Sequence, residues 1–246
     1  LRQGSAPIWK RTTRIHKVII SRNRYPPPYR TCTNRQDHPM PRRRSILVAT
    51  LCLALSACGS LIPAGHQTTD TAKLQKGNFR LDPDHTTVLF KANHLGFSTY
   101  VGRFNAISGS LDFDPASPAQ AKLQTSIDVA SVDTPSGDLD EILRGPDWLN
   151  AERFPTARFE SRSITVTSPT TGMITGDLTL HGVTAPITLE ATFRGGADNL
   201  LTDFYTLGFE TKSTFTRSTF GIGSLIPAIA DTVTLEIHAE FQRIDG

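Results

Sequence analysis

Cysteine is scarce in this chain of 246 residues, where it occurs three times, as Cys32, Cys52 and Cys58. All three precede the part of the sequence with a strand-like pattern. That part therefore has no thiol for a disulfide, a cysteine-bound metal or a nucleophile. Tryptophan and tyrosine are also rare, with two and four copies, whereas phenylalanine occurs 13 times. This balance favours aromatic rings that pack without needing a hydrogen-bond partner.

A long apolar run is missing as well, because the best candidate, residues 46–55, is much shorter than the ~20 residues of a membrane-spanning helix. Basic residues are unevenly placed: residues 1–44 hold 12 of the 26 lysines and arginines and one of the 23 acidic residues. Residues 45–246 keep 14 basic and 22 acidic side chains, so the sequence pI of about 8.9 describes only the front of the chain. Residues 45–246 show no cluster of basic residues, which argues against nucleic acid as a partner.

Residues 40–60 (MPRRRSILVATLCLALSACGS) have the anatomy of an export signal, with three arginines, a short apolar stretch and small residues before Cys58. The ending Leu55-Ser56-Ala57-Cys58 resembles a bacterial lipobox, in which the cysteine receives a diacylglycerol and becomes the new N-terminus. An ordinary signal peptide with an incidental cysteine is the alternative. Residues 40–57 are thus predicted to be a lipoprotein signal peptide, and residues 58–77 an acylated cysteine with a flexible tether. The resemblance to bacterial lipoproteins implies a periplasmic protein, and Gly59 after the cysteine then favours the outer membrane over the inner membrane as the anchoring site.

Residues 1–39 are basic, rich in proline and arginine, and without periodicity. We expect an upstream segment that is not translated or is disordered, with translation beginning at Met40.

Residues 78–246 show a period of two, which is typical of strands with one apolar face. In residues 233–241 (VTLEIHAEF), valine, leucine, isoleucine, alanine and phenylalanine alternate with polar side chains. The same alternation occurs in residues 87–93, 123–132, 174–180 and 187–193, separated by turn signals such as Asp114-Pro115 and Gly195-Gly196. The pattern predicts an all-β domain of about eight antiparallel strands that close or sandwich.

One segment departs from this pattern. Residues 136–149 (SGDLDEILRGPDWL) offer Ser136 as a helix N-cap, acidic residues in the first turn, and a Gly145-Pro146 stop. A single short helix is predicted there, inserted into the strand series as a lid or an end plug.

Together these blocks resemble the YceI-like family of polyisoprenoid-binding proteins. The matching blocks are residues 82–90 (DPDHTTVLF), 94–99 (HLGFST), 102–104 (GRF), 109–114 (GSLDFD), 127–134 (IDVASVDT), 154–155 (FP), 157–161 (ARFES), 176–186 (GDLTLHGVTAP), 217–222 (RSTFGI) and 231–237 (DTVTLEI). The helix differs: where the family usually has Arg-Asp and then His-Leu, this chain has Leu139-Asp140 and Ile142-Leu143.

The resemblance implies an eight-stranded antiparallel lipocalin-like β-barrel over residues 78–246. Its apolar tunnel would hold an isoprenoid lipid or a quinone, with no enzyme activity and no cofactor. From alternation we predict that the tunnel wall includes Phe90, Phe97, Phe104, Ile127, Phe159 and Phe215, and the helix segment is predicted to add Leu143 and Trp148. His94 and Arg103 are candidates for its mouth.

Other interpretations of His94 and Arg103 stay open: a structural role in the sheet, or catalysis in an isomerase or a peroxide-handling enzyme. No GxSxG or SxxK signature accompanies them, and no short-spaced histidine pair indicates a metal site. A small outer-membrane barrel would also alternate, but the inserted helix and the lack of paired aromatic girdles disfavour it. A homodimer is a further open alternative.

Overall fold

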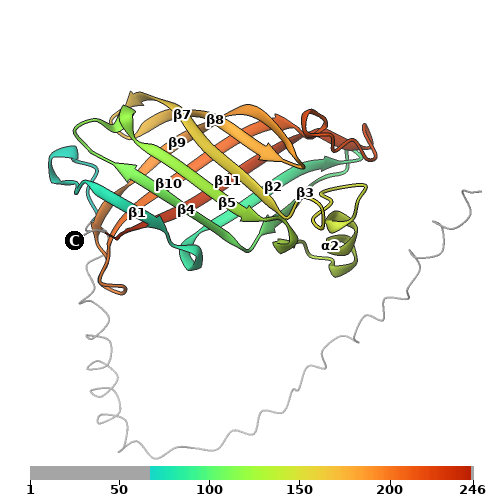
Figure 1. Cartoon of the computed structure of the whole chain (residues 1–246), viewed down its shortest axis with the longest axis horizontal. Coiled ribbons are helices and arrows are strands. Elements are labelled where there is room, and N and C mark those ends of the chain that lie inside the picture. The colour runs from blue at the N-terminus through green and yellow to red at the C-terminus, as the bar shows by residue number, and fades with distance from the viewer. Residues whose placement is uncertain (1–66, 245–246) are drawn as a thin grey trace, which may run out of the picture. The chain divides into compact units, whose positions relative to one another are not determined.

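The computed structural model describes residues 67–244, which form a closed, antiparallel, eight-stranded β-barrel with one short α-helix (Figure 1). The fold predicted from alternation and from the family resemblance is thus confirmed. The described residues belong to one compact unit, Ile62–Gly246. The predicted signal peptide, Cys58 and the upstream segment lie outside the described residues.

The described part of the chain contains eleven strands, one α-helix and several 3-10 turns. The strands are β1 (Gly77–Leu81), β2 (Thr87–His94), β3 (Ser98–Phe104), β4 (Ile107–Phe113), β5 (Lys122–Asp128), β6 (Val132–Asp133), β7 (Thr156–Ser168), β8 (Thr171–Leu180), β9 (Val183–Asp198), β10 (Tyr205–Thr216) and β11 (Ile229–Arg243). The helix is α2 (Gly137–Arg144), and short 3-10 turns include η3 (Thr71–Lys73), η4 (Pro83–His85), η5 (Pro118–Gln120), η6 (Val129–Ser131) and η7 (Arg217–Phe220).

Eleven labelled strands occupy eight positions in the barrel because three positions are interrupted. Strands β1 and β2 pair one after the other with β11, and η4 separates them. In the same way, β3 and β4 lie one after the other in a single position of the barrel, and so do β5 and β6. The ring β1-β4-β5-β7-β8-β9-β10-β11 is closed by the pairing of β1 with β11, so no full-length edge strand is left open.

Alternation in β11 assigns its two faces as the sequence predicts. Leu235, Ile237, Ala239 and Phe241 line an internal cavity. On the other face, Glu236 forms an ion pair with Lys91 of β2. Apolar side chains are thus withdrawn from water while the outer face keeps its charges.

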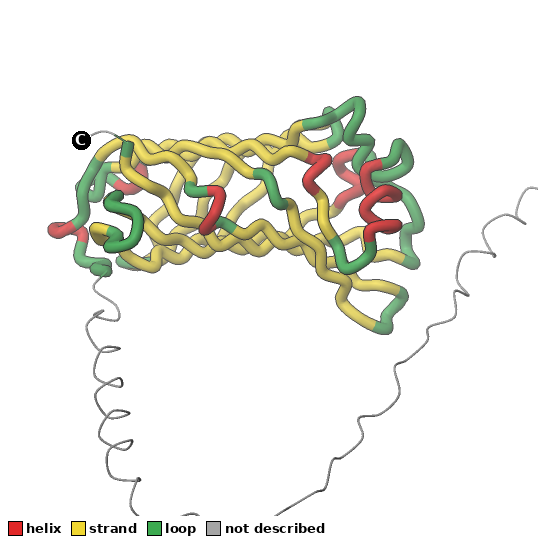
Figure 2. Tube along the Cα trace, turned by 90° about the horizontal axis from the view of Figure 1, so that it is seen from below, coloured by secondary structure: helices red, strands yellow, loops and turns green. Residues whose placement is uncertain are grey.

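The barrel has two different ends (Figures 1 and 2). The first, the helix end, carries α2, the β2–β3 turn (residues 95–97) and the long segment 217–228. The second, the turn end, carries η3, the loop with η5, the β7–β8 turn and the β9–β10 turn (residues 199–204).

Two clusters of buried side chains fill much of the interior. One gathers around Phe79, Val88 and Leu207, each fully buried. The other lies toward the helix end and includes Phe220 and Ile222, with Trp148, Leu149 and Phe215 packed against it. Phe220 and Ile222 of the second cluster plug the helix end. The predicted plug, α2, contributes none of its residues to this cluster, although Trp148 and Leu149, which follow α2, pack against it.

Arg217 organises this plug. Its side chain is only 5% exposed and donates hydrogen bonds to four backbone carbonyls. These acceptors belong to Ile222 (2.9 Å), Ser224 (2.8 Å), Ile229 (2.9 Å) and Ala230 (3.0 Å). The guanidinium also lies over the Trp148 ring, 5.2 Å from its centroid. Since a buried cation needs full compensation, these contacts fix the course of residues 217–230.

We predict that Arg217→Met lowers the free energy of unfolding by roughly 3–5 kcal/mol, because it leaves four carbonyls of the plug without their donor. Urea denaturation followed by circular dichroism measures the change. The matched control is Arg162→Met, which removes an arginine that is 62% exposed and pairs with Asp177 at the surface. That change should stay within about 1 kcal/mol. Equal losses in the two variants would contradict this role of Arg217.

Candidate functional site

The candidate site is a cavity of about 200 Å³ inside the barrel, between the two buried clusters. Its wall is mostly aliphatic, with Leu111, Leu123, Ile174, Leu178, Ile187, Leu189, Leu235 and Ile237. Aromatic rings come from Phe113, Phe159, Phe193, Phe209 and Phe241. These side chains converge because alternate residues of each strand point to the same face.

Polar groups are few in this wall. Hydroxyl groups come from threonines such as Thr125 and Thr211, and Arg158 is the one charged residue among those that line the cavity. Arg158 itself is exposed on β7. The lining contains no carboxylate and no histidine. The interior thus offers apolar contact area and no pair of groups for proton transfer.

The cavity extends to the turn end. Thr71 of η3, Pro118 of η5 and the β7–β8 turn with Pro169 and Thr170 belong to its lining. At the helix end the opposite holds, because Phe220 and Ile222 are 1% and 4% exposed and close the barrel. The cavity is therefore open toward one end and closed at the other.

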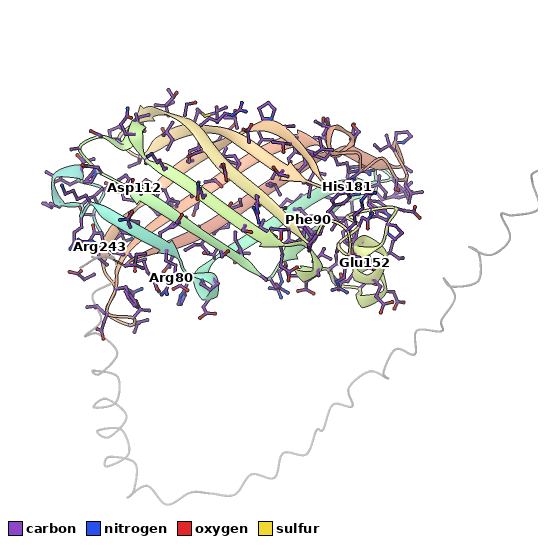
Figure 3. The ribbon with its side chains drawn as sticks, viewed as in Figure 1. Arg80, Phe90, Asp112, Glu152, His181 and Arg243 are labelled. Carbon is purple, nitrogen blue, oxygen red and sulfur yellow. The ribbon has the colours of Figure 1, made fainter. Side chains whose placement is uncertain are left out.

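Two of the residues predicted for the tunnel wall, Ile127 and Phe159, line this cavity. The other six lie elsewhere. Phe215 and Trp148 pack against the helix-end cluster, and Leu143 lies half-buried on α2. Phe90 and Phe104 pack on each other with ring centroids 5.5 Å apart (Phe90 is labelled in Figure 3). Ligand contacts by any of these residues stay predictions.

Phe97 needs a correction of position. Alternation placed it on the interior face, but its side chain is 87% exposed in the β2–β3 turn. The physical reason is that strand periodicity ends at His94, and Leu95 and Gly96 adopt positive φ angles of 55° and 75°. A turn of this kind reorients the side chains that follow it.

Most of the aliphatic residues in the cavity wall are absent from the predicted tunnel wall. Leu178, Ile187, Leu189 and Leu235 belong to the apolar faces that alternation shows in the sequence. The signal is therefore present in those faces, which also carry four lining phenylalanines outside the predicted set: Phe113, Phe193, Phe209 and Phe241.

His94 and Arg103 are both outside the lining of the cavity. His94 ends β2, where it pairs with Ser98 and lies beside Ile229. The Nε of Arg103 donates to Asp133 at 2.8 Å, on the neighbouring strand β6. This bond, and a second from Asn105, lower the pKa of Asp133. Among the described residues, the side-chain hydrogen bonds of this exposed Arg103–Asp133 pair involve only each other and Asn105, so they place no nucleophile beside Arg103.

Within residues 67–244, one group of side chains has ligand atoms close enough for a metal ion. Asp82, His85 and Glu240 have such atoms within 4.8 Å of one another. However, Asp82 already accepts hydrogen bonds from His85 Nδ1 (2.8 Å), from Gln242 and from the backbone N–H of Asp84. The bonds satisfy a buried carboxylate at the break between β1 and β2, which is a structural role.

Burial raises the pKa of Asp82, but the hydrogen bonds from His85 and from the Asp84 backbone outweigh it and lower that pKa below 3.8. The same hydrogen bond and the charge of Asp82 raise the pKa of His85 above 6.5. The pKa of Asp82 is lowered and that of His85 is raised for one reason: each partner stabilises the charged form of the other.

The architecture defines a class: an antiparallel barrel, closed at one end, with an apolar cavity and no catalytic constellation in its lining. Comparison with known proteins specifies the family. The model of the YceI-like domain matches residues 79–241, so the chain belongs to the YceI-like family.

Individual relatives agree with this assignment. A UPF0312 protein of Ectopseudomonas mendocina is 39% identical over 157 residues, which cover 63% of this chain and 81% of the relative. The crystal structure of BcnA from Burkholderia cenocepacia superimposes with a TM-score of 0.60 at 27% identity, over 65% of this chain and 98% of BcnA. A polyisoprenoid binding domain from Saccharophagus degradans has the same fold, with a TM-score of 0.51 at 14% identity over 69% and 100% of the two chains.

Among the described residues, no helix has both the length and the hydropathy required to cross a membrane.

We predict that His85→Gln destabilises the protein more at about pH 5 than at about pH 8.5. Because the pKa of His85 is raised, its contribution is fully present below 6.5 and is lost as the pH rises through the raised value. Asp82, whose pKa is lowered, stays charged at pH 5. Urea denaturation of both proteins at both pH values measures the difference. In an Asp82→Asn background the pH dependence of the His85→Gln effect should shrink strongly, because Asp82 is the largest cause of the raised pKa of His85, with smaller contributions from Glu240 and Asp84. An undiminished pH dependence would assign the effect to another group.

Proposed function

We propose that this protein binds one long-chain isoprenoid lipid, such as a polyprenyl lipid or a quinone, and stores or carries it without chemical conversion. The single observation that carries the proposal is the apolar cavity, open toward the turn end and plugged at the helix end. The polyisoprenoid binding domain of Saccharophagus degradans, which shares the fold, supports the choice of ligand class.

The chemistry of the wall supports a hydrocarbon ligand. An isoprenoid tail offers almost only CH groups, so its affinity must come from buried apolar area at ~25 cal/mol per Å². The lining supplies such area from every side, with leucine, isoleucine and phenylalanine side chains. A ligand that needed several hydrogen bonds would leave its polar groups unsatisfied there.

The size of the cavity limits how the ligand is held. At about 200 Å³ it exceeds the ~150 Å³ of a cavity that admits benzene, but it is smaller than the ~300–1,000 Å³ of drug-sized pockets. A slender tail fits this shape better than a fused-ring ligand. A tail longer than the cavity extends through the turn end, so the headgroup lies outside the barrel.

An enzyme that uses His94 and Arg103 is less well supported, because both residues lie outside the cavity lining and Arg103 is paired with Asp133. We further propose that the protein acts in the periplasm, anchored by acylated Cys58 to the outer membrane. The support is the sequence of residues 40–60.

Protein purified without detergent should release a long-chain isoprenoid on organic extraction, detected by mass spectrometry. We predict that Ala191→Trp, which fills the cavity from β9, lowers the bound lipid by about tenfold or more. The matched control Glu190→Trp places the same side chain on the exposed outer face and should keep the lipid. An empty wild-type barrel that also rejects added polyprenols and quinones would overturn the proposal.

The proposed anchor has its own test. When the full chain is expressed in a Gram-negative bacterium, Cys58→Ser should remove the mass of the acyl chains and shift the protein from the membrane fraction to the soluble periplasmic fraction. Intact-mass spectrometry and fractionation measure the two changes. An unmodified wild-type Cys58 would refute acylation, whatever the cavity contains.

A further inference from the structure

The β9–β10 turn exposes three large apolar side chains at one point of the molecule. Leu200 is 60% exposed, Leu201 is 88% exposed, and Phe204 is 39% exposed. We call these three residues the apolar hairpin tip. Single exposed leucines are common on protein surfaces, but adjacent ones at the tip of a hairpin form a patch that water solvates poorly.

The turn has a defined shape. The side chain of Asn199 accepts a hydrogen bond from the Leu201 N–H at 2.9 Å, and the Asn199 N–H donates to the Phe204 carbonyl at 2.8 Å. The Asp203 N–H returns to the Asn199 carbonyl at 3.0 Å. The two leucines are therefore presented to the outside by an internally bonded loop, which lowers the entropy lost when they are buried by a partner.

The hairpin also projects from the barrel. Pairing of β9 with β8 ends at Thr192, opposite Thr171, whereas pairing with β10 continues to Asp198. Six further residues at ~3.3 Å each carry the tip well beyond the β7–β8 turn that lines the cavity opening. The tip thus extends past the rim of the turn end (Figure 1).

The chain enters the barrel beside this hairpin. Thr68 pairs with Gly196 of β9 through two backbone hydrogen bonds of 3.0 and 2.9 Å. Eight residues lie between Cys58 and Gln67, the first described residue, and the nine steps from one to the other span at most about 30 Å. An anchor at Cys58 therefore keeps the membrane surface within that distance of the turn end.

We propose that the apolar hairpin tip inserts into the surface of a phospholipid bilayer, so that the open end of the cavity faces the membrane. The lipid then passes between bilayer and cavity without crossing water. This inference rests on the proposed lipid-binding function and on the anchor at Cys58. Charge does not favour an anionic surface, since the charged residue within the turn is Asp203. Insertion is hence driven by apolar area and should occur on neutral lipid.

The helix end supplies a matched control surface. Leu95 (52% exposed), Ile142 (54%) and Leu225 (65%) are also apolar and exposed. They lie at the plugged end, away from both the cavity opening and the entry of the chain. Membrane insertion there would turn the opening away from the bilayer.

The experiment uses the chain from residue 58 onward with Cys58→Ser, which removes the anchor and the apolar segment before it. BcnA, matched over 98% of its own length by 65% of this chain, shows that such a barrel folds without an equivalent of the front segment. Flotation with neutral phosphatidylcholine vesicles measures binding. Leu200→Ser/Leu201→Ser/Phe204→Ser should lower the bound fraction by about tenfold, with little sensitivity to salt. Leu95→Ser/Ile142→Ser/Leu225→Ser should bind as the parent does.

Two outcomes would overturn the proposal: equal binding by the hairpin-tip variant and the parent, or no binding of the parent to vesicles of any composition. The second outcome would make the tip a contact site for another protein. If the triple variant fails to fold, Leu201→Trp replaces it. Quenching of its fluorescence by brominated phosphatidylcholine, without quenching in Leu95→Trp, supports insertion, and equal quenching refutes it. Lipid extracted from the parent separates the two hypotheses. An empty cavity that also rejects added polyprenols and quinones refutes the proposed function, whereas a filled cavity without vesicle binding refutes only this inference.

Discussion

The buried guanidinium of Arg217 is the contact on which the shape of the cavity depends. It joins four carbonyls between Ile222 and Ala230 and lies over Trp148, so the segment before β11 and the segment after α2 are held together. A planar fork with several donors can satisfy carbonyls that point in different directions, which an ammonium group cannot do as well. Phe220 and Ile222 are packed into the barrel by this arrangement, and the helix end is closed.

Because the helix end is closed, a ligand can enter the cavity only from the turn end. The wall needs no polar groups to orient a ligand, because direction is already determined by the single entrance. This agrees with a lining of leucine, isoleucine and phenylalanine. Of the polar groups that the sequence singled out, Arg103 pairs with Asp133 of β6 on the outer surface. His94 ends β2 on the face of Val88 and Phe90, half-buried, with its ring centroid 6.4 Å from that of Tyr100.

The sequence predicted the strands well because the period of two is dictated by the backbone alone. Residues 233–241 show this most clearly, since their apolar face does line the cavity from Leu235 to Phe241. Periodicity could not determine which rings meet. Phe90 lies across Gly102, where an added Cβ would come within 2.3 Å of its ring, and this depends on the register of β2 and β3. Periodicity also could not predict the orientation of Phe97, which follows two residues with positive φ angles. The four carbonyl partners of Arg217 were equally beyond it, because they depend on the path of a loop.

The plug at the helix end has one more consequence, which concerns the length of the ligand. For the proposed isoprenoid ligand, the closed helix end limits how much of the tail the cavity can hold. A short tail would leave part of the wall uncovered, and each missing contact would weaken binding. A tail that reaches the closed end gains all of the wall, and further isoprene units add nothing inside. Affinity should thus rise with the number of isoprene units and then level off. Under the proposed function, the side chains that close the helix end would thereby set the tail length at which affinity stops rising.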